Sequence, residues 1–324
     1  MASAAMIRLA ATLLILCMLA VASLLIGVGD LRWGTLFGPG GSGAATLLFA
    51  SRVPRTLALL IAGAAIAVAG MVMQMLVRNR FVEPSTAGTV EAASLGMLAA
   101  NLAAPGAPIF AKMLVSAAFA LAGAALFLGL LRRIPLRSAV MVPLVGLMLG
   151  SVLGALATFI AYRFDLLQSL NAWTTGDFST VLRGRYELLW IGAILAIAVY
   201  VTADRFTVAG LGRDHATNLG LDYRRVLWMG LGIVALVTAS VVATVGVIPF
   251  LGLVIPNLVS LAVGDNMRRS LPYVALSGAG FLLACDIAGR LLNFPYEIPV
   301  GTVMGVVGSA LFLFLLLRRS DHVG

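Results

Sequence analysis

The sequence predicts an all-α membrane protein with about ten transmembrane helices and both termini in the cytoplasm. Of the 324 residues, 61% are hydrophobic and 11% are charged, and the mean hydropathy is +1.06. Soluble domains average about 25% charged residues. Long stretches without an ionisable residue recur along the chain. No stretch alternates apolar and polar residues in the way that a membrane β-barrel requires.

The uncharged stretches locate the spans in order, because a helix needs about 20 apolar residues to cross a hydrocarbon core of about 30 Å. Eight stretches each predict one span: 9–29, 56–77, 92–111, 113–131, 138–162, 188–203, 270–285 and 298–317. The stretch 226–264 would be about 58 Å long as a single helix. Gly246, Pro249 and Gly252 interrupt it, so we predict two spans joined by a tight turn. Residues 1–324 are interpreted as one transmembrane domain.

The basic residues orient these spans. With the N-terminus inside, fourteen of the 22 basic residues fall on the cytoplasmic side and eight on the outer side. This distribution follows the positive-inside rule, and an even number of spans returns the C-terminus to the cytoplasm. Residues 164–186 are then an external loop that we expect to contain a short surface helix. Residues 204–225 form a long cytoplasmic loop, which glycines divide into two short helices.

The residues that an enzyme would need are scarce. The sequence has two histidines, His215 and His322, so an intramembrane triad of histidine ligands for a metal cannot form. A phosphate-binding P-loop needs a lysine after its glycines, but the only lysine, Lys112, follows "APIFA". We therefore expect no catalytic residue, metal site or cofactor. If ATP drives transport, another subunit must hydrolyse it.

Two features predict a transport path. Glu91 lies near the start of the third span, and a carboxylate inside a membrane is a functional candidate. It either faces a water-filled path or lies beside Arg78 or Arg80 at the inner interface. Small residues at 146, 150 and 154 share one face of the fifth span.

These three small residues are Gly146, Gly150 and Gly154. Such a face suits ordinary close packing of helices, but it also suits a smooth pathway, and we predict that it lines the path. Another charged pair lies in the ninth span, where Asp286 precedes Arg290 by one helical turn. We expect an i,i+4 ion pair that neutralises both side chains.

Three stretches resemble the FecCD permease family, the membrane subunits of binding-protein-dependent ABC importers for iron-siderophores, haem and cobalamin. They are "SRVPRTLALLIAGAAIAVAGMVMQ" (51–74), "IPFLGLVIPNLVSL" (248–261) and "CDIAGRLL" with "EIPVGTVMGVVGSALFLFLL" (285–316). They occur in the order typical of the family, and the ten-span count fits it. The resemblance therefore covers nearly the whole chain.

The resemblance implies a larger assembly. In this family two permease subunits form the pathway, two ATPase subunits bind below, and a periplasmic or lipid-anchored binding protein delivers the ligand. Arg52 and Arg55 match the R-x-P-R motif and Arg290 ends the A-D-I-x-x-R motif, which implies docking to glutamates of the binding protein. The loop 204–225 lies where the family couples to its ATPases. Its coupling residues are then Gly210, Gly212, Arg213, Asp214 and Gly220.

One departure from the family pattern bears on the substrate. Where many members have N-P-L-A-x-P, this chain has "NRFVEPSTAGTVEAASLG" (79–96). That variant resembles the branch that imports ferric siderophores, often of catecholate type, through two non-identical permeases. The sequence thus predicts a multi-pass permease subunit for a ferric siderophore in the bacterial inner membrane, surrounded by lipid and without a nucleic-acid partner. Whether its partner permease is identical or different stays open.

Three alternatives remain at this point. A haem or cobalamin permease of the same family is the first. An ion-coupled secondary carrier is the second, and it predicts uptake that is lost when the ion gradient is dissipated and that does not depend on an ATPase. A structural membrane anchor is the third, and it predicts that bulky substitutions in the fifth span leave transport unchanged.

Overall fold

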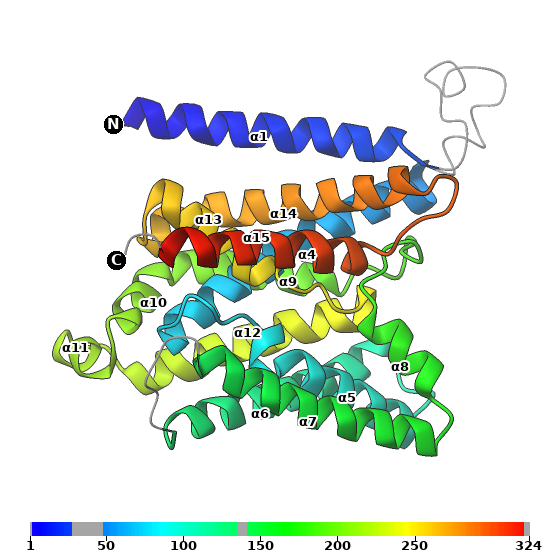
Figure 1. Cartoon of the computed structure of the whole chain (residues 1–324), viewed down its shortest axis with the longest axis horizontal. Coiled ribbons are helices and arrows are strands. Elements are labelled where there is room, and N and C mark those ends of the chain that lie inside the picture. The colour runs from blue at the N-terminus through cyan, green and yellow to red at the C-terminus, as the bar shows by residue number, and fades with distance from the viewer. Residues whose placement is uncertain (1, 28–47, 135–140, 321–324) are drawn as a thin grey trace.

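The computed structural model describes residues 2–27, 48–134 and 141–320 of the chain. Within these ranges all regular secondary structure is helical, so the predicted fold class is confirmed. Figure 1 shows the long helices lying side by side along a common direction. Arg32 and Arg137, which were counted in the orientation of the spans, lie outside the described residues.

Seven of the described helices are long and apolar enough to cross a membrane. They are α1 (Ala2–Leu25), α4 (Val53–Val77, preceded by the π-turn η1 at Leu48–Arg52), α6 (Ile109–Leu131), α7 (Met141–Arg163), α12 (Tyr223–Val245), α14 (Met267–Leu292) and α15 (Val300–Ser320). An eighth span results if α9 (Leu189–Val201) and α10 (Ala203–Gly210), which bend by 68°, are taken together.

The predicted count of ten complete spans is not confirmed, because two apolar segments form shorter helices. These are α5 (Thr89–Ala103, 15 residues) and α13 (Leu251–Val263, 13 residues). At 1.5 Å per residue each is about 20 Å long, less than the hydrocarbon core.

A connector without α-helix precedes each short helix. Residues 78–88, with the 3-10 turn η2 (Ser85–Ala87), lead into α5, and residues 246–250 lead into α13. The second break falls at the predicted interruption of the stretch 226–264, which is confirmed. Phe250, the last residue before α13, has a φ of 63°. This left-handed conformation is rare for a bulky side chain.

Short helices distinguish the two ends of the bundle. The segment 164–186 contains α8 (Leu167–Thr174), and the segment 204–225 contains most of α10 together with α11 (Arg213–Asn218). These short helices lie at opposite ends of the bundle in Figure 1, which we call the α8 end and the α11 end. The start of α1 and the end of α15 both lie at the α11 end.

Helix α4 forms the core of the molecule. In its most apolar stretch 83% of the residues are buried, against 6% in α1. Glycines let neighbouring backbones approach it closely. A Cβ atom at Gly63 would lie 2.7 Å from the carbonyl oxygen of Gly278 in α14, and one at Gly70 would lie 2.1 Å from that of Gly252 in α13. Any larger residue at these two positions would push α14 or α13 away from α4.

Candidate functional site

The three arginines predicted to dock a binding protein lie at the α8 ends of α4 and α14. Arg55 donates from Nε and Nη2 to Oδ1 of Asp286, at 3.2 and 2.7 Å, and from Nη1 to Oε2 of Glu297 at 2.6 Å. Arg290 pairs with the other carboxylate oxygen of Asp286, so the predicted i,i+4 ion pair is confirmed. Together with Arg52, these residues form what we call the arginine cluster.

Hydrogen bonds from the arginine cluster hold the end of α1. Arg290 donates from Nη1 to the carbonyl oxygens of Ser23 and Ile26 at 2.9 and 2.8 Å, and from Nη2 to the Ser23 hydroxyl at 2.6 Å. Arg52 donates from Nη1 to the carbonyl oxygens of Leu24 and Leu25. The last carbonyls of a helix have no partner within the helix. The guanidinium groups satisfy them and fasten α1 to α4 and α14.

Burial separates the members of the arginine cluster into two groups. Arg52 is 7% exposed and Arg290 is 5% exposed, and the side chain of Asp286 is fully buried. The side chains of Arg55 and Glu297 keep 13% and 27% of their surface exposed. The sequence alone predicted three arginines ready to bind a partner, but the structure shows two of them packed against α1. Arg55 and Glu297 are the charged members that reach the surface.

The glycine face of α7 packs against η2 and the first turn of α5. A Cβ atom at Gly146 would lie 1.9 Å from the carbonyl oxygen of Thr86, and one at Gly150 would lie 3.2 Å from the carboxylate of Glu91. Gly154 is packed less tightly, with the nearest atom of Glu91 at 3.9 Å. This is the close helix packing that the sequence left open as the alternative to a pathway. Exposed apolar side chains cover other sides of α7, among them Leu147, Met148, Val152, Leu156 and Phe159.

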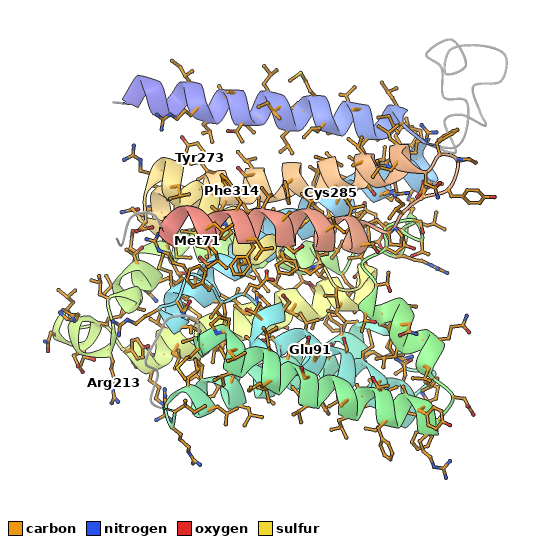
Figure 2. All side chains as sticks on the ribbon, viewed as in Figure 1. Met71, Glu91, Arg213, Tyr273, Cys285 and Phe314 are labelled. Atoms are coloured by element: carbon orange, nitrogen blue, oxygen red, sulfur yellow. The ribbon has the colours of Figure 1, made fainter. Side chains whose placement is uncertain are left out.

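Glu91 lies inside the helix bundle, in the first turn of α5 (Figure 2). Its Oε2 atom is buried and has no hydrogen-bond partner among the described residues. Arg80, one of the two neighbours considered from the sequence, pairs with Asp265 instead. Glu91 therefore remains a candidate for the transport path.

The residues predicted to couple to an ATPase lie in and around α10 and α11. Gly210 ends α10, Gly212 precedes α11 with a φ of 107°, and Gly220 follows α11 with a φ of 78°. L-amino acids with side chains rarely adopt such angles. Arg213 and Asp214 are exposed in α11, and Figure 2 shows Arg213 on the part that projects from the bundle.

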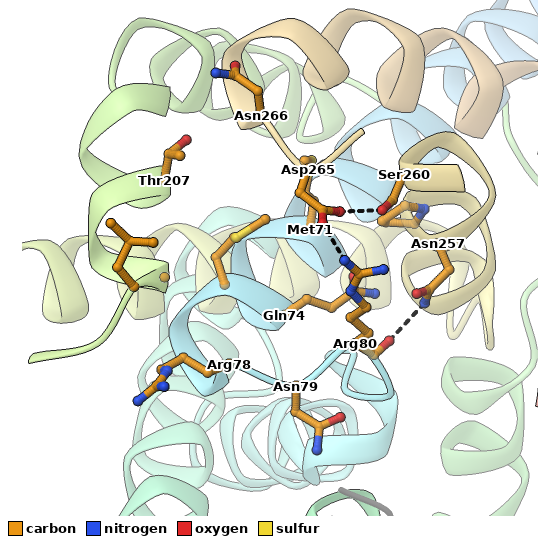
Figure 3. A pocket seen from close by; sticks show the side chains of 14 residues that line it. Met71, Gln74, Arg78, Asn79, Arg80, Thr207, Asn257, Ser260, Asp265 and Asn266 are labelled. Atoms are coloured by element: carbon orange, nitrogen blue, oxygen red, sulfur yellow. Dashed lines mark hydrogen bonds and ion pairs between the residues drawn. The ribbon is translucent and has the colours of Figure 1, made fainter. Parts of the chain in front are cut away.

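A pocket of about 600 Å³ lies where α10 faces the α11 ends of α4 and α13 (Figure 3). Its polar lining comprises Gln74, Arg78, Asn79, Arg80, Thr207, Asn257, Ser260, Asp265 and Asn266. Arg80 pairs with Asp265, which accepts a hydrogen bond from Ser260, and Asn257 donates to the carbonyl oxygen of Arg80 at 2.8 Å. Sequence reasoning missed this set because its members come from distant parts of the chain.

Glu83, in the connector between α4 and α5, is a second feature that the sequence reasoning missed. It is 1% exposed. Its Oε1 atom accepts hydrogen bonds from the Phe250 amide at 2.8 Å and the Ser85 hydroxyl at 2.5 Å, and the carboxylate lies next to the amides of Gly252 and Leu253. Burial raises the pKa of the Glu83 carboxyl to about 7, although these hydrogen bonds act in the opposite direction. In the sequence, Glu83 is marked only by its place in the stretch 79–96, which departs from the family pattern.

Comparisons with curated proteins find relatives along nearly the whole chain. The chain is 50% identical over 309 residues to the petrobactin import system permease protein YclN of Bacillus subtilis (strain 168), covering 95% of this chain and 98% of that protein. It is 41% identical over 301 residues to the ferric-anguibactin transport system permease protein FatD of Vibrio anguillarum, covering 93% and 95%.

The fold and a family model lead to the same group of proteins. A solved structure described as a metal-chelate type ABC transporter in an inward-facing conformation matches with a TM-score of 0.78 and 26% identity, covering 96% of this chain and 99% of that one. The model of the FecCD transport family matches residues 11–318. The chain therefore belongs to the FecCD transport family.

Proposed function

We propose that the chain is the permease subunit of a bacterial ABC importer that carries a ferric siderophore across the cytoplasmic membrane. The observation that carries this proposal is the identity of 50% over 95% of the chain with a petrobactin permease. A ferric-anguibactin permease at 41% identity supports the same substrate class. The permease has no ATPase site of its own, and partner subunits hydrolyse the ATP.

Uptake measurements test the substrate class. A strain that lacks this permease receives iron-55-labelled ferric petrobactin, ferric anguibactin, haem or labelled cobalamin, with and without the restored gene. We expect the gene to restore uptake of at least one ferric siderophore and to leave haem and cobalamin uptake unchanged. Restored uptake of haem or cobalamin alone would support the alternative within the family. Siderophore uptake that stops when the ion gradient is dissipated, but continues without the ATPase, would support an ion-coupled carrier.

The importer in this proposal contains two permeases, two ATPase subunits and a binding protein outside the membrane. The exposed helix α11 supports an ATPase contact at the α11 end, because it projects from the bundle and lies between Gly212 and Gly220, which both have left-handed backbone. The exposed apolar side chains of α7 and α15, such as Phe159 and Phe314, support a face that either the second permease or lipid covers.

Docking of the binding protein is proposed at Arg55. Its Nη1 atom binds Glu297, which is partly exposed, so a glutamate of the partner can replace Glu297 at the guanidinium. Arg52 and Arg290 then hold the outer ends of α1 and α14 in place around Arg55. Glu297 competes with the partner for Arg55 in this arrangement.

The variant Glu297→Gln tests this competition. We expect the assembled importer with this variant to capture its ligand-loaded binding protein more tightly at low salt, because Arg55 is released for the partner's carboxylate. Asp165→Asn is the matched control, since it removes one exposed negative charge from the segment next to α8 without touching the cluster. Equal affinities in the wild type and Glu297→Gln would refute docking through Arg55.

A further inference from the structure

The two connectors without α-helix meet at Glu83. The amides in the first turn of a helix have no partner within the helix, and a negative charge near them is favourable. The carboxylate of Glu83 accepts a hydrogen bond from the amide of Phe250 at 2.8 Å and lies next to the amides of Gly252 and Leu253, at the start of α13. It therefore caps α13, although it lies 167 residues away from Phe250 in the sequence.

Further contacts join the same turn of α13 to α4 and its connector. Gln74, near the end of α4, donates a hydrogen bond from Nε2 to the carbonyl oxygen of Gly252 at 3.1 Å and is 8% exposed. Phe312 of α15 contacts both Phe81 and Phe250, with ring centroids 6.0 and 6.5 Å apart. Residues 78–88, the first turn of α13 and the end of α4 are thus held together around Glu83.

A small cavity adjoins the carboxylate. It measures about 10 Å³, and its polar lining comes from Glu83, Ser85 and Thr238, the last from α12. Thr238 is fully buried, and its hydroxyl has no hydrogen-bond partner within the described parts of the chain. A buried water needs about this much room and two to four polar partners. The three side chains meet that requirement.

We propose that one buried water bridges Glu83 and Thr238, and that Glu83 is a positioning residue for transport. Glu83, its amide partners and this water form what we call the Glu83 latch. The latch makes the connector 78–88 and the start of α13 move as one unit with α4. Since α10 packs on α4, with Gly210 next to Met75, movement of the α10–α11 segment is passed through α4 to α13. The inference rests on the proposed importer function.

Two variants and a control test the latch in the complete importer, reconstituted with its ATPase and binding-protein partners. Glu83→Gln removes the charge, and Thr238→Val removes the hydroxyl that binds the water but keeps the shape. Ser116→Ala is the control, because it removes another buried hydroxyl, which donates to the carbonyl oxygen of Ala93 at 2.8 Å. Hydrogen–deuterium exchange of residues 246–254 reports the latch and does not depend on the substrate. Iron transported per ATP hydrolysed, with iron-55 ferric petrobactin as the probe, reports coupling.

We expect Glu83→Gln to raise exchange in 246–254 by about tenfold, the effect of losing about one strong hydrogen bond, and to lower transport per ATP in correctly assembled complexes. Thr238→Val should show the same changes at smaller size, and Ser116→Ala should show neither. Exchange and transport per ATP at the wild-type level in Glu83→Gln would overturn the proposal. If Glu83→Gln does not assemble, Thr238→Val decides, and wild-type values for both measurements in that variant would overturn it. The latch and the proposed substrate can fail separately. If exchange rises in Glu83→Gln but the wild-type importer does not take up ferric petrobactin, the latch is supported and only the choice of petrobactin as substrate is contradicted.

Discussion

Replacing Asp286 with asparagine should destabilise the protein much more than replacing Glu297 with glutamine, although each change removes a carboxylate from Arg55. The side chain of Asp286 is fully buried and pairs with Arg55 and Arg290, which are 13% and 5% exposed. The side chain of Glu297 is 27% exposed and pairs with Arg55. Both variants remove a carboxylate that pairs with Arg55, and the two carboxylates differ in how deeply they are buried.

The magnitudes follow from desolvation. Removing one partner of a buried ion pair costs about 3–5 kcal/mol, because the remaining charge is left without water and without a counter-charge. Asp286→Asn leaves the buried guanidinium of Arg290 in that state, whereas Arg55 keeps its pair with Glu297, so we expect a loss of about 3–5 kcal/mol. A partly exposed pair contributes about 0–1 kcal/mol, and we expect Glu297→Gln to remain within that range.

Thermal unfolding of the detergent-purified protein, followed by fluorescence-detected size-exclusion chromatography, measures the difference. A loss of 4 kcal/mol corresponds to a fall of about 6 °C in the midpoint for a chain of this size, because the entropy of unfolding is about 2.1 cal/mol/K per residue. The midpoint of Glu297→Gln should stay near that of the wild type. Equal midpoints for the two variants would refute the reasoning that burial of Asp286 determines the stability of the arginine cluster.

Two further predictions concern glycine packing and coupling. Gly146→Ala should destabilise the protein by about 1–3 kcal/mol, because its Cβ would overlap the Thr86 carbonyl. Gly154→Ala should be neutral, because its Cβ would make an ordinary contact. The unfolding midpoints of the two variants check this difference. Gly212→Val should uncouple ATP hydrolysis from transport in an inserted complex, since φ is 107° there, and wild-type uptake per ATP would contradict it.

The positions of the helices could be predicted well from hydropathy, because lipid excludes charge from the spans. Each of the ten predicted spans overlaps a described helix, although their bounds differ. The lengths of α5 and α13 could not be predicted from charge, because the connector 246–250 carries no charge and the charges of the connector 78–88 do not show where the next helix begins. Gly246 and Pro249 marked the second connector, but the stretch "FVEPSTAG" was interpreted only as a family variant.

The sequence predicted which residues belong to the candidate site better than it predicted what those residues contact. The motif in the sequence brought Arg52, Arg55 and Arg290 together, but their exposure depends on the carbonyl groups at the end of α1, which no local pattern reveals. Glu83 was missed for a similar reason, because its partners lie 167 residues further along the chain. For Gly146, spacing alone fits a packing face and a pathway equally, and its close contact with the Thr86 carbonyl in η2 could not be predicted from the sequence.

Helix α4 connects the two ends at which partners of the importer are proposed to bind. Its 25 residues span about 37 Å. Arg55, in its first turn, is tied to α14 by Asp286, and Met75, in its last turn, packs next to Gly210 of α10. Between these points the glycines of α4 contact α14 and α13 backbone to backbone, so a bend in α4 would require those helices to move as well. A displacement of α10 is therefore expected to shift α4 as a rigid body and to change the position of Arg55 at the α8 end, which is the direction of coupling that an importer driven by ATP requires.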